Sequence, residues 1–299
     1  MTAVVAESVP EPSTGSGPAA RTGTNETAGA RRIHEAFAAA RGEDRTALVP
    51  YVVAGYPDPD TSLRIAVAAI DAGADLLEVG LPYSDPLADG ATLQRASQVA
   101  LAAGATLDAS LRLIEQIATA RPATPIVPMG YANQFLGGGD GRAAAARLVA
   151  AGAAGVIVAD LTPDEGEAFE GVAREHDLAL VYLVAPTTAP ERRAAIAARS
   201  GGFLYCVSLV GVTGARTSLP TSVGQLVRDV RAASPVPVGV GFGVSRPAHV
   251  EAIAQAGADG VIVASALVDA LGEAGTDVET MADLVRELRA ATARGTANG

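Results

Sequence analysis

Residues 72–79 read AGADLLEV, residues 151–158 read AGAAGVIV, and residues 256–263 read AGADGVIV. Each stretch follows an alanine-rich segment of helical length and runs directly into a short apolar segment. A glycine just past the end of a helix supplies the left-handed cap that ends it. Each stretch therefore predicts a helix that ends and a strand that begins within a few residues. Three junctions of one kind predict a chain built from repeated strand–helix units.

Outward from these junctions, segments of helical length alternate with eight apolar runs of strand length: Leu48–Val53, Asp75–Val79, Pro125–Met129, Gly155–Ala159, Leu178–Val184, Phe203–Val207, Val236–Val240 and Gly260–Val263. The runs are apolar throughout, as expected of parallel strands that are buried on both faces. Eight such units in about 250 residues favour a closed (β/α)8 TIM barrel, which is an α/β fold. An open, doubly wound sheet is the alternative.

Both ends of the chain carry additions to this pattern. Residues 1–29 are rich in Pro, Gly, Ser, Thr and Ala without apolar periodicity, which predicts a disordered tail. Residues 31–42 have helical apolar spacing and predict an extra helix before the first strand. Residues 265–271 predict a short extra helix after the eighth strand. The expected organisation is therefore the tail, 1–29, followed by a single barrel domain, 30–299.

The composition excludes several classes of protein. The net charge of −11 argues against binding to nucleic acid, which needs a basic surface. The apolar runs are too short to cross a membrane, and the N-terminus shows no secretory signal. The single cysteine, Cys206, excludes an intrachain disulfide and suits a reducing compartment, so a cytoplasmic location is expected.

The residue types that are missing restrict the chemistry. All 22 basic residues are arginine, so no lysine can form a Schiff base with a substrate or with pyridoxal phosphate. No group of His, Cys, Asp and Glu has the spacing of a metal site. We therefore expect an active site without a metal or a cofactor.

Glu78 is the first candidate for catalysis, because it is a charged residue near the end of an apolar strand. Side chains alternate along a strand, so Leu77 and Val79 share one face while Glu78 occupies the other and points into the barrel mouth. Partial desolvation there would raise the pKa of Glu78 and suit it to acid–base catalysis. The alternative is a structural ion pair with an arginine of a neighbouring strand, although no predicted strand interior contains one.

Asp85 and Asp89 follow in the next loop. Asp85 precedes Pro86 and Asp89 precedes Gly90, so each could also be a turn-forming residue. A barrel places its active site on the loops after its strands, which makes both candidates. From the residues alone, the two readings of Asp89 stay evenly balanced, and the turn is favoured for Asp85.

Glycine-rich segments follow the sixth and seventh strands, at residues 211–215 and 241–243, and Ala264-Ser265 follows the eighth. Loops at this end of a barrel, with the start of a short extra helix, commonly bind phosphate through backbone N–H groups. If such a barrel breaks a carbon–carbon bond without a lysine or metal, the substrate itself must accept the electrons. An indole ring protonated at C3 can do so, with Glu78 and Asp89 as the available pair.

The chain resembles the tryptophan synthase α subunit family from about Leu48 to about Leu271. The segments that carry the resemblance are EVGLPYSDPLADG at 78–90, QRAS at 94–97, LVAPTT at 183–188, YCVS at 205–208, GVTGA at 211–215 and GFG at 241–243. The resemblance implies retro-aldol cleavage of indole-3-glycerol phosphate to indole and glyceraldehyde 3-phosphate. It also implies an αββα complex with a β subunit that carries pyridoxal phosphate and receives the indole.

The resemblance implies a role for individual residues. Glu78 corresponds to the group that transfers the proton at indole C3, and Asp89 to the group that accepts the indole N–H. Other residues correspond to the substrate pocket (Tyr51, Tyr131, Tyr205 and Thr213), to the phosphate site (Gly214, Gly243, Ala264 and Ser265) and to the surface facing the β subunit (Asp85, Pro86 and Asn133).

Some positions depart from the family. Ala264 replaces a glycine that usually precedes the phosphate-binding serine, and its Cβ would crowd the phosphate if the backbone required a positive φ. Gly130, Gln134, Thr162 and Val210 are also unusual. Alternative functions are a free-standing or specialised indole-3-glycerol-phosphate lyase, a catalytically weak barrel that mainly activates a β subunit, and a sugar-phosphate isomerase with Glu78 as sole base.

Overall fold

The computed structural model describes residues 26–207, 221–241 and 243–294. The strands are β1 (Ala47–Val53), β2 (Leu77–Gly80), β3 (Ile126–Gly130), β4 (Gly155–Val158), β5 (Ala179–Val181), β6 (Leu183–Val184), β7 (Leu204–Val207), β8 (Val238–Gly241) and β9 (Gly260–Val263). The helices are α1 (Ala28–Gly42), α2 (Pro59–Asp71), α3 (Ala91–Ala102), α4 (Leu107–Ala120), α5 (Ala132–Leu136), α6 (Arg142–Ala150), α7 (Pro163–Glu175), α8 (Pro190–Ala197), α9 (Thr221–Ala233), α10 (Pro247–Gln255), α11 (Ser265–Ala270) and α12 (Val278–Ala290).

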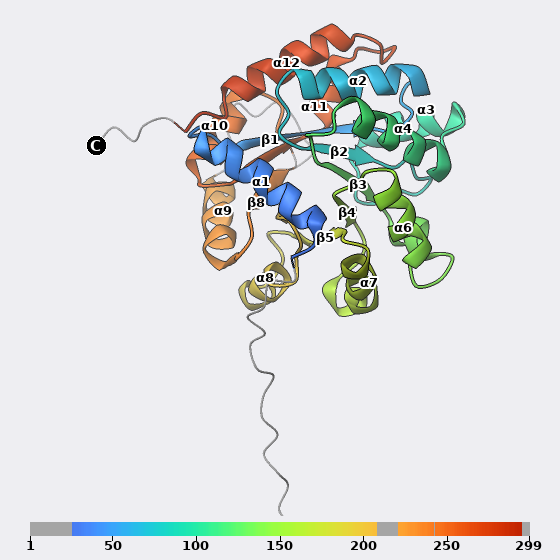
Figure 1. Ribbon diagram of the computed structural model, residues 1–299. Coiled ribbons are helices and arrows are strands. Elements are labelled where there is room, and N and C mark those ends of the chain that lie inside the picture. The colour runs from blue at the N-terminus through green and yellow to red at the C-terminus, as the bar shows by residue number, and fades with distance from the viewer. Residues whose placement is uncertain (1–25, 208–220, 242, 295–299) are drawn as a thin grey trace, which may run out of the picture.

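The strands form one parallel sheet in the order β5-β4-β3-β2-β1-β9-β8-β7-β6. Only Tyr182 separates β5 from β6, so the two ends of this order meet and the sheet curls into a nearly closed barrel, with the helices around it (Figure 1). The predicted TIM barrel is therefore confirmed, including the extra helix α1 before β1 and the short extra helix α11 after β9.

Two boundaries differ from the sequence prediction. The single strand expected at Leu178–Val184 is two short strands, because β5 pairs with β4 whereas β6 pairs with β7. The first helix begins at Ala28 instead of residue 31, since the Thr27 side chain accepts a hydrogen bond from Ala30 N at 3.1 Å and caps it. Residues 28 and 29 thus belong to the fold, and residues 1–25 of the expected tail lie outside the described residues.

Buried side chains form an inner and an outer layer. The inner layer fills the barrel and includes Val49, Leu76, Val127, Ile157, Val181, Phe203 and Ile262. Helix α1 lies across the barrel (Figure 1). It adds Ile33 and Phe37 to this layer, and the Phe37 and Phe203 ring centroids are 5.6 Å apart. The outer layer packs the other strand face against the helices. Because α1 covers the amino-terminal ends of the strands, the opposite end is left for a site.

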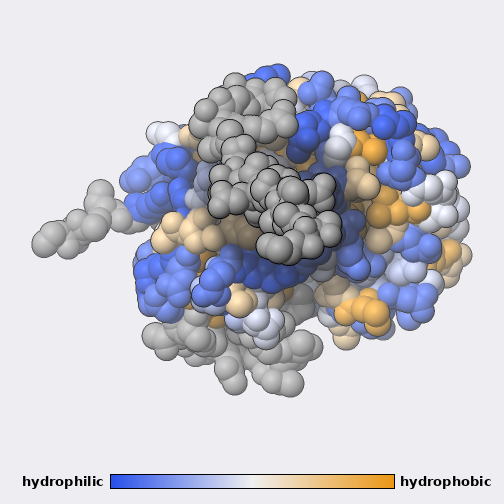
Figure 2. All heavy atoms as spheres, turned by 90° about the horizontal axis from the view of Figure 1, so that it is seen from below, coloured by the Kyte–Doolittle hydropathy of each residue, from blue (hydrophilic) through white to orange (hydrophobic). Residues whose placement is uncertain are grey.

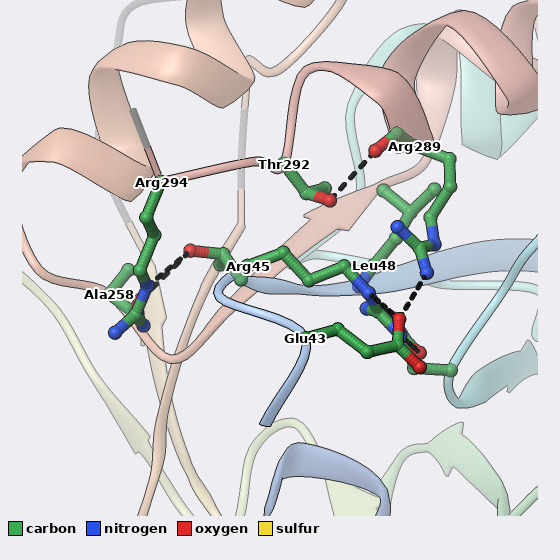
Figure 3. A network of polar contacts seen from close by, with 9 residues as sticks. Glu43, Arg45, Leu48, Ala258, Arg289, Thr292 and Arg294 are labelled. Atoms are coloured by element: carbon green, nitrogen blue, oxygen red, sulfur yellow. Dashed lines mark hydrogen bonds and ion pairs between the residues drawn. The ribbon is translucent and has the colours of Figure 1, made fainter. Parts of the chain in front are cut away.

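The aspartates of the Ala-Gly-Ala-Asp stretches attach neighbouring strands to each other. Asp75 accepts a hydrogen bond from Leu48 N at 2.8 Å, and Asp259 accepts one from Val238 N at 2.9 Å. Arg45 binds both oxygens of Asp75, at 2.6 and 2.7 Å. Arg45 and Arg289 are also both directed toward Glu43 (Figure 3). This network fixes β1, β2 and α12 at the closed end of the barrel.

Replacing Arg45 with Met is expected to lower the free energy of unfolding by about 3–5 kcal/mol, because it leaves the Asp75 carboxylate buried without its cation. The side chains of Arg45 and Asp75 are only 7% and 11% exposed. The matched control is Arg121→Met, since Arg121 and Asp71 form a pair that is 36% and 52% exposed. That change should cost less than about 1 kcal/mol. Urea unfolding measures both, and equal losses would contradict the expectation.

On the face shown in Figure 2, hydrophobic atoms form small areas among hydrophilic ones. Leu87, Val99 and Val149 are the large hydrophobic side chains that are most exposed among the described residues. In the same part of the chain, no helix is both long and apolar enough to cross a membrane.

Candidate active site

Glu78 lies on β2, beside Tyr51 of β1 and Val127 of β3 in the sheet register. Its side chain is directed into the barrel, as strand alternation predicts, because Leu77 and Val79 belong to the outer layer. Glu78 is 1% exposed, and neither of its carboxyl oxygens has a hydrogen-bond partner among the described residues. The structural ion pair with an arginine is therefore not found there.

The pKa of Glu78 is raised to about 8, first by burial and then by the negative charge of Asp89. A buried carboxylate without donors is costly, so the neutral acid is the stable form at pH 7. Glu78 is thus a carboxylic acid that can give a proton at neutral pH.

Asp89 lies in the loop between β2 and α3 and is half-buried. Burial raises the pKa of Asp89 to about 6, so its carboxyl is mostly ionised at pH 7. Its charge also raises the pKa of Tyr51, Tyr131 and Tyr205. Asp89 is therefore close to the other predicted pocket residues.

Three tyrosines gather around the two carboxyl groups. Tyr51 and Tyr205 are buried, and burial is the main cause that raises their pKa well above 10. The pKa of Tyr131 is raised to about 12, again mainly by burial. All three stay protonated at neutral pH, so they present neutral hydroxyl groups beside Glu78 and Asp89. The structure thus brings together five residues that the sequence selected.

Two glycines that the sequence did not single out for this purpose make room for the tyrosine hydroxyls. A Cβ at Gly80 would lie 1.8 Å from the Tyr51 hydroxyl oxygen, and a Cβ at Gly241 would lie 2.5 Å from that of Tyr205. Side chains at these positions would displace the tyrosines from the barrel mouth. A glycine at the end of a buried strand was the available sequence signal for close approach.

Only some of the residues predicted to bind phosphate are among those that the structure describes. Thr213 of the pocket and Gly214 of the phosphate site lie outside the described residues, as does Val210. Gly243 and Ser265 follow the neighbouring strands β8 and β9, and Ser265 is the first residue of α11. Ala264 has φ −123°, so a Cβ causes no left-handed strain there, and the expected difficulty at Ala264 does not arise.

The predicted partner surface lies on the loop after β2 and on α5. Asp85 and Asn133 are exposed and Pro86 is half-buried. Leu87, which the sequence analysis did not single out, follows Pro86 in this loop and is 93% exposed. A leucine next to a proline and two aspartates was the signal that could have found it. Among the described residues, no cluster of three or more His, Cys, Asp or Glu could hold a metal ion.

A family model described as tryptophan synthase alpha chain matches residues 37–296. The chain belongs to the tryptophan synthase alpha chain family. It is 47% identical over 260 residues to the tryptophan synthase alpha chain of Roseiflexus castenholzii, covering 86% of this chain and 99% of the relative. The alpha chain of Chloroflexus aurantiacus is 44% identical over 265 residues, with 88% and 99% covered.

Solved structures agree with this assignment. The chain resembles tryptophan synthase from M. tuberculosis in an open form, with a TM-score of 0.80 and 40% identity, over 88% of this chain and 99% of the other. It also resembles the tryptophan synthase alpha chain of Legionella pneumophila, with a TM-score of 0.80 and 31% identity, over 89% and 98%. As a tryptophan synthase alpha chain it is a lyase of tryptophan biosynthesis, which cleaves indole-3-glycerol phosphate to indole and glyceraldehyde 3-phosphate.

Proposed function

We propose that Glu78 and Asp89 carry out this cleavage in two different protonation states. The two carboxyl groups have different surroundings, and this difference supports the proposal. Glu78 is buried without a hydrogen-bond partner among the described residues, which raises its pKa to about 8, whereas Asp89 is half-buried and its pKa is raised to about 6. Pairs of acids whose environments separate their pKa values commonly divide the roles of acid and base. At pH 7 Glu78 holds a proton and Asp89 holds a charge.

The reaction then needs only proton transfers and one bond cleavage. Glu78 gives its proton to indole C3, and the ring nitrogen takes up the positive charge beside the Asp89 carboxylate, which accepts the N–H. The bond between C3 and the glycerol chain breaks, and its electron pair returns to the ring. The hydroxyl on the departing carbon loses its proton to the Glu78 carboxylate as the aldehyde forms. Glu78 is protonated again at the end.

The remaining pocket residues bind and orient the substrate. Tyr51, Tyr131 and Tyr205, with Thr213, line the indole and glycerol part of the pocket. Gly214, Gly243, Ala264 and Ser265 bind the phosphate through backbone N–H groups and a hydroxyl, which needs no lysine. The positions of Gly243 and Ser265 after neighbouring strands support this assignment.

We also propose that the chain works in an αββα complex in the cytoplasm, with a tryptophan synthase β subunit as its partner. Asp85, Pro86, Leu87 and Asn133 would face that subunit. The exposure of Asp85, Leu87 and Asn133 on adjacent segments supports this surface. The β2–α3 loop carries both the surface and Asp89, so docking would act directly on the catalytic carboxylate. Indole release measured with and without the β subunit tests the partner, and full turnover by the isolated chain would favour a free-standing lyase.

The roles of Glu78 and Asp89 predict a bell-shaped dependence of kcat/KM on pH. Activity falls as the pH drops through about 6, because Asp89 is raised to that pKa by burial and must be ionised. Activity falls again as the pH rises through about 8, because Glu78 must be protonated. Because the two groups interact, the ionisation of each one shifts the limb of the other. Initial rates of indole release from pH 5 to 10 check this, and a profile that is flat between about pH 5 and 9 would contradict it.

A further inference from the structure

Gln134, on α5, joins two segments that follow neighbouring strands. Its Oε1 accepts a hydrogen bond from Tyr131 N at 2.9 Å. Its Nε2 donates a hydrogen bond to Pro82 O at 3.1 Å. Tyr131 follows β3 directly, and Pro82 lies in the loop after β2. One side chain therefore attaches the start of α5 to the loop that leads to Asp89.

Tyr131 makes a second attachment to the same loop. Its hydroxyl oxygen accepts a hydrogen bond from Ala88 N at 3.0 Å. Its ring stacks on Tyr83, with centroids 5.0 Å apart and an angle of 27° between the planes. Residues 82–88 are thus held near both ends by the start of α5, and Asp89 follows at once.

The loop is also held together internally. Leu87 N donates to Asp85 O at 2.9 Å, and Asp89 N donates to Pro86 O at 3.1 Å. The Gln94 side chain, on α3, donates to Asp89 O at 2.9 Å. These bonds hold residues 85–89 together, and Ala88 N attaches them to Tyr131 at the start of α5, where the Gln134 side chain also holds Pro82 O.

We infer that Gln134 is a positioning residue for the cleavage, which holds the β2–α3 loop so that the Asp89 carboxylate faces the indole site. This inference rests on the proposed role of Asp89. Gln134 acts through Pro82 and through the backbone of Tyr131, and no substrate contact is assigned to it.

Loss of the Gln134 hydrogen bonds would change the titration of Asp89. Burial is what raises the pKa of Asp89 to about 6, so a loop released from α5 would expose the carboxyl and lower that pKa. The groups that face Asp89 are Glu78 of β2, Tyr51 of β1, Tyr131 beside β3 and Tyr205 of β7. All four are protonated near pH 6, so the acidic limb of kcat/KM reports on Asp89.

Two substitutions separate positioning from simple capping of α5. Gln134→Met removes both hydrogen bonds. Gln134→Glu keeps an acceptor for Tyr131 N, as a capping glutamate does. Its second carboxylate oxygen cannot donate a hydrogen bond, so the bond to Pro82 O is lost. We expect kcat to fall about tenfold or more in both variants, because small misplacements of a catalytic group have large effects on rate. In Gln134→Met the acidic limb should also move to lower pH.

The control is Thr106→Ala at the start of α4. It removes the capping hydrogen bond that Ala109 N donates to Thr106 Oγ1 at 3.1 Å. It should leave kcat and the pH profile unchanged. If Gln134→Glu kept the wild-type kcat, Gln134 would act only as a cap of α5, and the inference would be overturned. An equal loss of activity in Thr106→Ala would overturn it as well, because the effect would then be one of general stability.

A double variant tests whether Gln134 acts through Asp89. In an Asp89→Asn background, Gln134→Met should lower kcat little further, since the two changes affect one interaction. Independent, multiplying effects would overturn the positioning role while leaving the role of Asp89 intact. If Asp89→Asn alone left the acidic limb in place, the proposed role of Asp89 would fail first, and that result is distinguishable.

Discussion

Glu78→Gln is expected to lower kcat for indole release by about 10²–10⁴-fold, the range for loss of a proton-transferring group. Glutamine has nearly the same shape as the neutral glutamic acid but cannot give up a proton to indole C3. Glu78 is 1% exposed and its oxygens have no hydrogen-bond partner among the described residues, so the amide disturbs few neighbours. Indole release at substrate saturation measures the effect.

Substrate binding should survive this change. An indole-propyl phosphate that lacks the glycerol hydroxyls cannot be cleaved, and its affinity for the variant should stay near the wild-type value in calorimetry. The matched control is Glu115→Gln, which makes the same exchange at an exposed position of α4 and should leave kcat unaltered. Retained turnover in Glu78→Gln would reject the role of Glu78.

Asp89→Asn is expected to lower kcat by about 10²–10³-fold, which is the usual effect of removing one group that stabilises charge in a transition state. Asparagine can still accept the indole N–H but carries no charge to oppose the cation on the ring. Because the charge matters most in the transition state, kcat should fall more than affinity does.

The pH profile of Asp89→Asn gives a second, independent readout. Its acidic limb near pH 6 should disappear, because that limb is the titration of Asp89. The basic limb should remain but move to lower pH, since the charge of Asp89 is one of the causes that raise the pKa of Glu78 to about 8. If the acidic limb were unchanged in this variant, it would be the titration of a group other than Asp89.

Much of this architecture could be predicted from residue patterns. Strand runs that are apolar on both faces predict a parallel barrel, and the period of two along a strand predicts that Glu78 faces inward while Leu77 and Val79 face the helices. The structure confirms both. The burial of Glu78 could be predicted from these local rules alone, because it depends only on which face of its strand the side chain occupies.

Other features depend on distances between segments that are far apart in the chain. The break between β5 and β6 arises because one run of residues pairs with β4 at its start and with β7 at its end. The space that Gly80 leaves for Tyr51 depends on how two strands approach each other. The hydrogen bond from Gln134 to Pro82 O depends on the contact between α5 and the β2–α3 loop. The residue pattern within one segment does not predict contacts between segments that are far apart in the chain.

Asp89 lies between these two cases. Its place in a loop after a strand made it a candidate, but the turn-forming sequence around it explained it equally well. Its charge acts on Glu78 and on three tyrosines, which shows that Asp89 lies near the other candidate residues. These groups lie on β1, β2 and β7 and directly after β3, which only the closed barrel brings together.

In this mechanism Glu78 holds a proton at neutral pH while Asp89 is ionised. The most direct test is the infrared difference spectrum between the wild-type chain and Glu78→Gln, recorded across a pH series. We expect a protonated-carboxyl absorption of Glu78 at pH 7 that disappears as the pH rises through about 8. A carboxylate absorption of Glu78 at pH 7 would contradict the mechanism.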